Sequence, residues 1–310
     1  MISPSLENRK AELPLGRPGD RIFLGFEAQH KIFQRLSGFP LAQQLSREVY
    51  DFYGNHLVYI ESTNFSSTIF TLRLHHQPLL LKSAEIHLQL GTNRTAEALA
   101  HELLHLHLFI LGFPLGEIVQ IPFPFDHYAQ EFLGMCHWVL NLIQHELNYQ
   151  SFVALGFDKN HFLGRSDDPI DYRKRLSPEY QNGYPAQVDF PRWCMDYLRH
   201  FFVARHGGDE NSLDLAQDVL TWGSRLYPQL RQVIAEIRKW FEIGAFKVPS
   251  QYPNQVNFLL ELMGIPKFIG WARLELSYQK TPVAVRLEPK LFLTPECGRG
   301  GHWETPLGTH

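Results

Sequence analysis

Two histidines four residues apart, His101 and His105, have the spacing that most clearly predicts chemistry in this chain. In an α-helix, residues four apart lie on one face about one turn apart, so both imidazoles can bind a single zinc ion. Glu102 follows the first histidine and can take a proton from a zinc-bound water without occupying a coordination position. The segment His-Glu-Leu-Leu-His therefore supplies two candidate metal ligands and a candidate general base.

The residues around this motif predict the helix that it requires. The run Ala96 to Leu111 is apolar on nearly every side, the composition of a buried helix. Thr95 is a suitable N-cap, and Gly112 followed by Pro114 is typical of a helix end. Buried imidazoles and a buried carboxylate cost free energy unless they are paired or bind a metal. This cost favours a metal site over histidines that match the motif by chance.

The segments before the helix are expected to form a small sheet. Their residue patterns predict strands at 57–60, 68–75, 79–82 and 85–90, the last alternating polar and apolar residues with a period of two. A small sheet followed by a helix with this motif resembles the zincin metallopeptidases, over roughly residues 55–155. The resemblance implies an α+β fold with a mixed sheet, an active-site helix and a second long helix. It also implies a peptide substrate that adds to the edge strand of the sheet.

A catalytic zinc normally has three protein ligands, so a third must come from elsewhere in the chain. The metzincin arrangement is excluded because Leu108 and Leu111 occupy the positions where it requires glycine and histidine. The next long helix, predicted at about residues 126–152, contains four further candidates, which are Glu131, His137, His145 and Glu146.

Two arguments about the third ligand compete. If the two helices form a hairpin with a compact turn, the motif lies about 10 Å from the end of its helix, and this register favours Glu131. That choice would match the gluzincins and the ImmA/IrrE-like peptidases. The second argument places a histidine of the following helix as third ligand. This arrangement is similar to that of the SprT-like metallopeptidases and favours His145, although Glu146 stands where that family has glycine. Asn141, one turn earlier, could orient His145 through a hydrogen bond.

We therefore predict a Zn²⁺ ion bound by His101, His105 and His145, with Glu102 as catalytic base. Glu131, Glu146 and His137 remain alternatives for the third ligand, and Tyr149 or His107 could donate to the substrate oxyanion.

These residues predict a zinc metallopeptidase that hydrolyses peptide bonds of a protein or peptide substrate. The alternative is a non-catalytic protein, containing zinc or free of metal, that keeps the motif and acts by binding a partner. A fourth protein ligand would indicate a structural zinc, whereas an open coordination position would indicate catalysis.

Composition limits the setting of this activity. The chain has 310 residues, of which 44% are hydrophobic, and a formal net charge of −3, so nothing in the charge balance favours nucleic acid or an anionic membrane. The three cysteines, Cys136, Cys194 and Cys297, are widely spaced, as in proteins of a reducing compartment. No segment reads as a signal peptide or a membrane span, so we expect a cytoplasmic protein. The sequence does not indicate an oligomeric state.

The chain is expected to divide near residue 165. Residues 1–165 would form the zincin-like domain, with a flexible lead over residues 1–20 and a helix at 41–53 before the first strand. Residues 166–310 would form a mainly helical accessory or regulatory region. Within it we expect helices at 191–205 and 213–240, the latter interrupted near Pro228, a short helix after Pro253 and a strand at 282–288.

Overall fold

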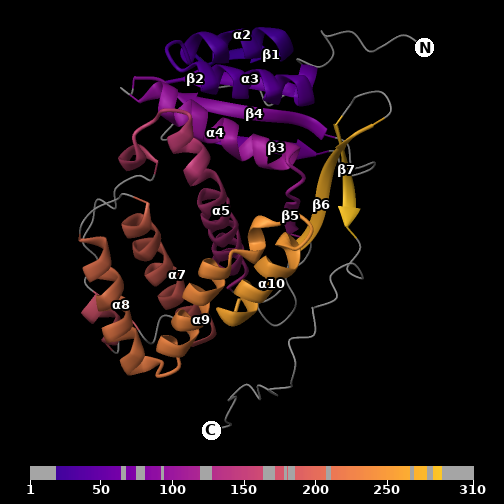
Figure 1. Ribbon diagram of the computed structural model, residues 1–310. Coiled ribbons are helices and arrows are strands. Elements are labelled where there is room, and N and C mark those ends of the chain that lie inside the picture. Colours follow the sequence, from indigo (N-terminus) through magenta and orange to yellow (C-terminus); the bar gives the residue numbers. More distant parts are fainter. Residues whose placement is uncertain are drawn as a thin grey trace.

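The computed structural model describes residues 19–63, 68–74, 81–91, 94–118, 128–162, 172–177, 180, 186–206, 211–265, 269–277 and 282–287. In this part of the chain, a layer of helices and strands lies at one end and a group of helices at the other, with α5 (Ala129–Ala154) running between them (Figure 1). The predictions for residues 1–18 and for Cys297 lie outside the described residues.

The first sheet has four strands in mixed orientation. Their order is β1 (Arg21–Leu24), β2 (Leu57–Ser62), β4 (Leu81–Gln89) and β3 (Ile69–Leu74). β2 and β4 are parallel, whereas the pairs β1/β2 and β3/β4 are antiparallel. The predicted break between strands 79–82 and 85–90 is wrong, because β4 is one strand that continues from Leu81 to Gln89. β3 lies at the edge of the sheet.

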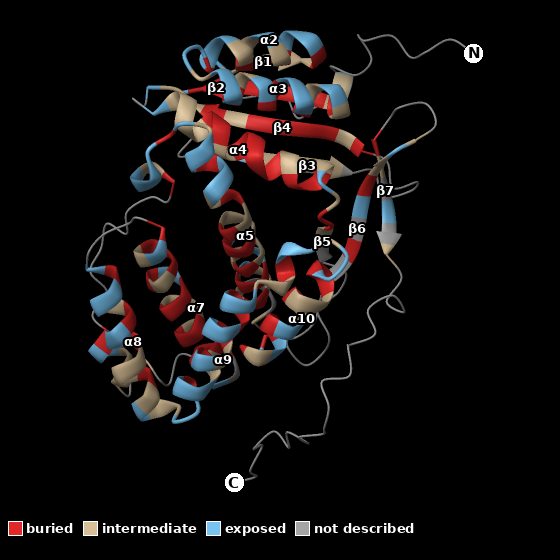
Figure 2. Cartoon of the chain, viewed as in Figure 1, coloured by how far each residue is buried: buried red, intermediate tan, exposed pale blue. Residues whose placement is uncertain are grey.

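Three helices cover one face of this sheet. They are α2 (Gly25–Arg35), α3 (Pro40–Tyr53) and α4 (Thr95–Ile110). Side chains alternate between the two faces of a strand, and those of Ala84, Ile86 and Leu88 on β4 join the buried faces of these helices in one core. Figure 2 shows these inner faces in red. The predictions of α3 and α4 are confirmed, whereas α2 and β1 were not predicted.

The boundaries of α4 have clear local causes. The helix ends before Gly112, whose φ of 86° lies in the left-handed region that glycine enters without strain. The predicted cap at Thr95 is wrong by one residue, because Arg94 occupies the N-cap position and its side chain makes no capping hydrogen bond.

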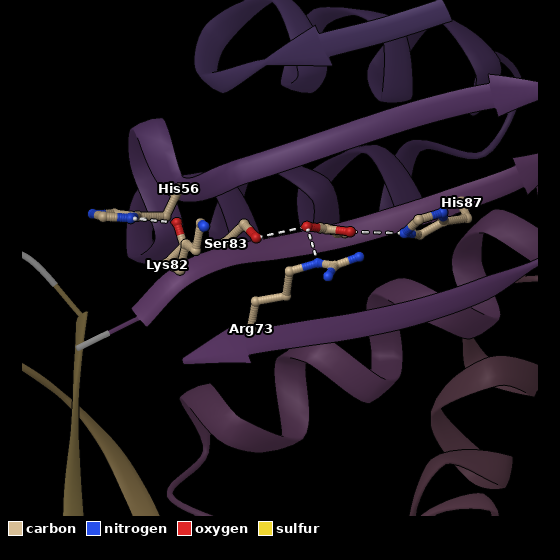
Figure 3. Close-up of polar contacts among 6 residues, drawn as sticks. His56, Arg73, Lys82, Ser83 and His87 are labelled. Atoms are coloured by element: carbon tan, nitrogen blue, oxygen red, sulfur yellow. Dashed lines mark hydrogen bonds and ion pairs between the residues drawn. The ribbon is translucent and has the colours of Figure 1, made fainter. Parts of the chain in front are cut away.

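The opposite face of the first sheet carries a polar network that ties the edge strand to β4. Glu85 is buried, and its carboxylate accepts hydrogen bonds from Ser83 Oγ at 2.7 Å, Arg73 Nε at 2.6 Å and His87 Nε2 at 2.9 Å (Figure 3). Arg73 comes from β3, while the other residues come from β4. The network therefore holds β3 in place from the face that the helices leave free.

The carboxyl-terminal half is mainly helical, as predicted. Its helices are α7 (Ala186–Arg205), α8 (Ser212–Leu226), α9 (Leu230–Ile243) and α10 (Tyr252–Leu262). The predicted interruption near Pro228 is confirmed by the gap between α8 and α9. The predicted start of a helix at Pro191 is wrong, because α7 begins five residues earlier and contains the proline, which removes one helical hydrogen bond.

A second sheet joins segments that are far apart in the sequence. β5 (Leu115–Ile118) pairs with β6 (Ile269–Leu276), which pairs with β7 (Pro282–Leu287), all antiparallel. β7 was predicted, but β5 and β6 were not. Because β5 lies between α4 and α5, residues on either side of position 165 share this sheet.

α5 also links the two halves through its packing. Its 26 residues span about 39 Å. Side chains from its first half, including Phe132 and Val139, are buried with residues of α7, α9 and α10, whereas Phe152 near its end is buried with the first sheet and α4. The α+β class is confirmed by these elements, while the division at residue 165 stays a prediction. None of the helices in the described ranges combines the length and apolar character needed to cross a bilayer.

Candidate metal centre

Three histidine side chains converge between α4 and α5. His101 Nε2 lies 3.0 Å from His145 Nε2 and 3.1 Å from His105 Nε2. One ligand atom from each residue lies within 4.8 Å of the other two. Tetrahedral coordination with Zn–N bonds of about 2.0–2.1 Å places neighbouring nitrogens about 3.3 Å apart. The cluster therefore has nearly the dimensions of a zinc site.

Hydrogen bonding alone does not account for these contacts. Each nitrogen of a neutral imidazole either donates one proton or accepts through one lone pair. His101 Nε2 has two close nitrogen neighbours and can form a hydrogen bond with only one of them. A metal ion would accept a lone pair from every ring and satisfy all three nitrogens, so the donor set fits a bound metal.

The protonation state of the rings also fits a metal. Burial lowers the pKa of His105 to about 4. Burial, together with the neighbouring histidines, lowers the pKa values of His101 and His145 well below the ordinary value. The three rings are therefore neutral near pH 7, and neutral imidazole is the form that binds metals.

Gln144 orients one of the ligands. His105 Nδ1 lies 2.9 Å from Gln144 Oε1. Because an amide oxygen only accepts, Nδ1 carries the proton and the lone pair of Nε2 faces the cluster. α5 thus supplies both a ligand and the residue that orients a ligand of α4. Sequence reasoning missed Gln144. The orienting residue that it proposed, Asn141 for His145, is exposed. A polar residue directly before His145 on a largely apolar helix was the available signal.

Glu102 lies beside the cluster and contacts the edge strand. It is 8% exposed, and the backbone N–H of Phe70 on β3 donates a hydrogen bond to its carboxylate. Burial raises the pKa of Glu102 to about 8. The ring of Phe70 stacks on His105 with centroids 4.8 Å apart. The edge strand therefore contacts both the candidate base and a candidate ligand.

An aromatic side chain covers the other side of the cluster. Phe162, which follows α5, is 3% exposed, and its ring centroid lies 4.9 Å from His101 and 5.6 Å from His145. Phe152 packs against Phe162 at 5.1 Å. This apolar surrounding is the physical cause of the low pKa values of the histidines.

The alternative third ligands lie away from the cluster. Glu131, in the first turn of α5, is 14 residues before His145, about 21 Å along the helix axis. His137 is exposed and about 12 Å away along the same axis. Glu146 is buried but faces α7, where its Oε2 atom lies 2.6 Å from His206 Nε2.

The structure also places the two predicted oxyanion donors. His107 Nε2 lies 3.3 Å from Glu48 Oε2 on α3. The ring of Tyr149, one turn after His145, packs against Phe162 at 5.4 Å. Of these two residues, Tyr149 is therefore the one that contacts the aromatic surroundings of the cluster.

The compact-hairpin argument fails because α5 extends far beyond the end of α4. α4 ends five residues after His105, whereas α5 begins 16 residues before His145. The excess of about 11 residues corresponds to about 16 Å of helix. This first part of α5 packs into the core of the carboxyl-terminal half. That packing sets the register of α5 against α4, which the sequences of the two helices alone do not predict.

Within the described residues, the only group of three or more His, Cys, Asp or Glu side chains close enough to hold a metal is formed by His101, His105 and His145. No protein-family model, curated protein or solved structure matches this chain. The function proposed below rests on the geometry and chemistry of this site.

Proposed function

We propose that this protein is a zinc-dependent metallopeptidase with a zincin-like core that hydrolyses peptide bonds of a protein or peptide substrate. The observation that carries the proposal is the convergence of three histidines at ligand distance beside a buried glutamate. Three protein ligands leave a coordination position open, which is the pattern of catalytic rather than structural zinc sites.

Glu102 is the residue that would move protons in this reaction. When bound, zinc supplies a Lewis acid that acidifies a coordinated water and polarises the substrate carbonyl. The carboxylate form of Glu102 would be favoured, against the effect of burial, if the adjacent His101 held a divalent cation. The carboxylate would accept a proton from the attacking water as the water oxygen bonds to the carbonyl carbon. It would then deliver this proton to the amine nitrogen as the C–N bond breaks. The Phe70 N–H holds one orientation of the carboxylate.

The position of the edge strand is consistent with a peptide substrate. β3 contacts both Glu102 and His105 through Phe70. An extended peptide can add to an unpaired strand edge through backbone hydrogen bonds. Such a peptide would pass beside the candidate base.

The choice of zinc is tested by metal content. Imidazole ligands suit zinc, and also copper, iron and nickel, so elemental analysis of the purified protein must identify the ion. We expect about one zinc per chain in the wild type and in Glu131→Ala, and loss of zinc in His145→Ala. A wild type without metal, even after reconstitution, would refute the proposal.

The hydrolytic mechanism is tested separately with Glu102→Gln. This variant should keep its zinc and lose hydrolysis of a fluorescently labelled casein by about 10²–10⁴-fold, the usual contribution of a general base. His101→Ala should lose both zinc and hydrolysis. Zinc binding without hydrolysis of any protein by the wild type would instead favour the non-catalytic interaction protein.

A further inference from the structure

A buried hydrogen bond between Glu146 and His206 connects the carboxyl-terminal half to the helix that carries His145. Glu146 directly follows His145, and its side chain is 4% exposed. Its Oε2 atom lies 2.6 Å from His206 Nε2, and its Oε1 atom lies 3.4 Å from Arg205 Nη2. Arg205 is the last residue of α7, and His206 directly follows it. The carboxylate is therefore held from α7 by two charged or polar donors.

His206 also packs against the aromatic residues around the metal centre. Its ring centroid lies 4.1 Å from that of Tyr149 and 6.4 Å from that of Phe162. Phe162 in turn contacts His101 and His145. Only one layer of side chains thus separates His206 from the candidate ligands.

Stability alone does not explain this pair. Desolvation of buried polar and charged groups offsets most of the attraction between them, and apolar residues of similar volume are often at least as stabilising. His206 Nδ1 is also buried without a hydrogen-bond partner in the described part of the chain. A buried unpaired nitrogen costs further free energy. A pair that is costly in both respects is better explained by the geometry it imposes.

The Glu146–His206 contact fixes the rotational orientation of α5 about its helix axis. Successive residues of an α-helix point about 100° apart. Anchoring Glu146 on α7 therefore fixes the directions of the two residues before it, His145 and Gln144, toward α4. These residues supply one candidate ligand and the acceptor that orients another.

We propose that Glu146 and His206 form a positioning pair that holds α5 in the rotation required for metal binding. The carboxyl end of α7 then supports the metal centre. This inference rests on the proposed function, because it presupposes that the three histidines bind zinc.

The test compares zinc affinity, measured by competition with a chromophoric chelator, in Glu146→Gln and His206→Gln. Both variants should bind zinc about 10–100-fold more weakly than the wild type, the usual effect of losing a residue that orients a ligand. Arg205→Gln removes the donor that is 39% exposed, cannot disrupt the core, and should weaken binding by a smaller factor. Tyr227→Phe is the matched control. It removes a 3.0 Å hydrogen bond to Asp189 of α7, should lower the melting temperature, and should leave zinc affinity unchanged.

The outcomes separate this inference from the proposed function. A wild type that binds no zinc refutes the proposed function itself. A wild type that binds zinc, with affinity unchanged in Glu146→Gln and His206→Gln, overturns the positioning role alone. Weaker binding in Glu146→Gln with equal or tighter binding in His206→Gln also overturns it, because a purely electrostatic influence would weaken binding only where the negative charge of Glu146 is removed.

Discussion

Replacing Gln144 by leucine should weaken metal binding while leaving the metal-free fold almost unchanged. Gln144 Oε1 accepts a hydrogen bond from His105 Nδ1 at 2.9 Å. His105 is 1% exposed, so water cannot replace this acceptor. In the metal-free variant, the ring can move its proton to Nε2 and donate it to His101 Nε2, which lies 3.1 Å away. The free energy of unfolding of the metal-free chain should therefore change little.

Metal binding prevents this change of tautomer in His105. To coordinate through Nε2, His105 must carry its proton on Nδ1, where the leucine leaves it buried and unpaired. An unpaired buried donor costs about 1–3 kcal/mol. Since about 1.4 kcal/mol corresponds to a tenfold change in affinity, the expected loss is about 5- to 150-fold. Zinc affinity should thus fall by one to two orders of magnitude.

The assay is competition between the protein and a chromophoric chelator, with thermal unfolding of the metal-free protein alongside. Gln144→Glu keeps an acceptor for Nδ1–H and should bind zinc at least as tightly as the wild type. Asn141→Leu, an exposed position on the same helix, is the control and should bind zinc normally. Wild-type affinity in Gln144→Leu, or an equal loss in Asn141→Leu, would refute the argument that Gln144 fixes the tautomer of His105.

Three further predictions concern stability. Burial favours the protonated form of Glu85, but hydrogen bonds from His87, Ser83 and Arg73 lower its pKa from 4.5 to about 2. The ionised carboxylate therefore contributes fully to the stability of the fold above about pH 4.5, and this contribution is lost towards pH 2. Glu85→Gln should be less stable than wild type in urea at pH 7 but equally stable near pH 2; an equal difference at both values would contradict this. A Cβ at Gly223 would lie 2.7 Å from Trp193 Cε3, so Gly223→Ala should lower the free energy of unfolding by about 1–3 kcal/mol, and a higher melting temperature would show the packing argument wrong. Excess zinc should raise the melting temperature of the wild type but not that of His105→Ala. At a free zinc concentration of a hundred times Kd, the wild type should gain about 2.7 kcal/mol in its free energy of unfolding. Equal shifts in the two proteins would show that the metal binds elsewhere.

Much of the local structure followed from the sequence. The apolar run with its Gly112 stop predicted α4, and the helical period placed His101 and His105 on one face. Pro228 similarly predicted the gap between α8 and α9, the run Leu57 to Ile60 predicted β2, and an alternating pattern predicted β7. These features depend on neighbours within a few residues, and such interactions are encoded directly in the chain.

The choice of the third histidine depended on tertiary structure. The sequence offered Glu131, His137, His145 and Glu146 on one helix, and only the register of α5 against α4 brings His145 into the cluster. That register is set by contacts between distant segments, such as the packing of Phe132 with the carboxyl-terminal helices and the pairing of β5 with β6.

The same long-range contacts decided the roles of the neighbouring residues. Gln144 faces His105, and Glu146 faces His206, 60 positions further along the chain. No periodicity in α5 distinguishes a side chain that faces α4 from one that faces α7, because both directions are buried. The sequence by itself determined the motif and its helix, whereas the packing of α5 between two cores decided which side chains complete the site.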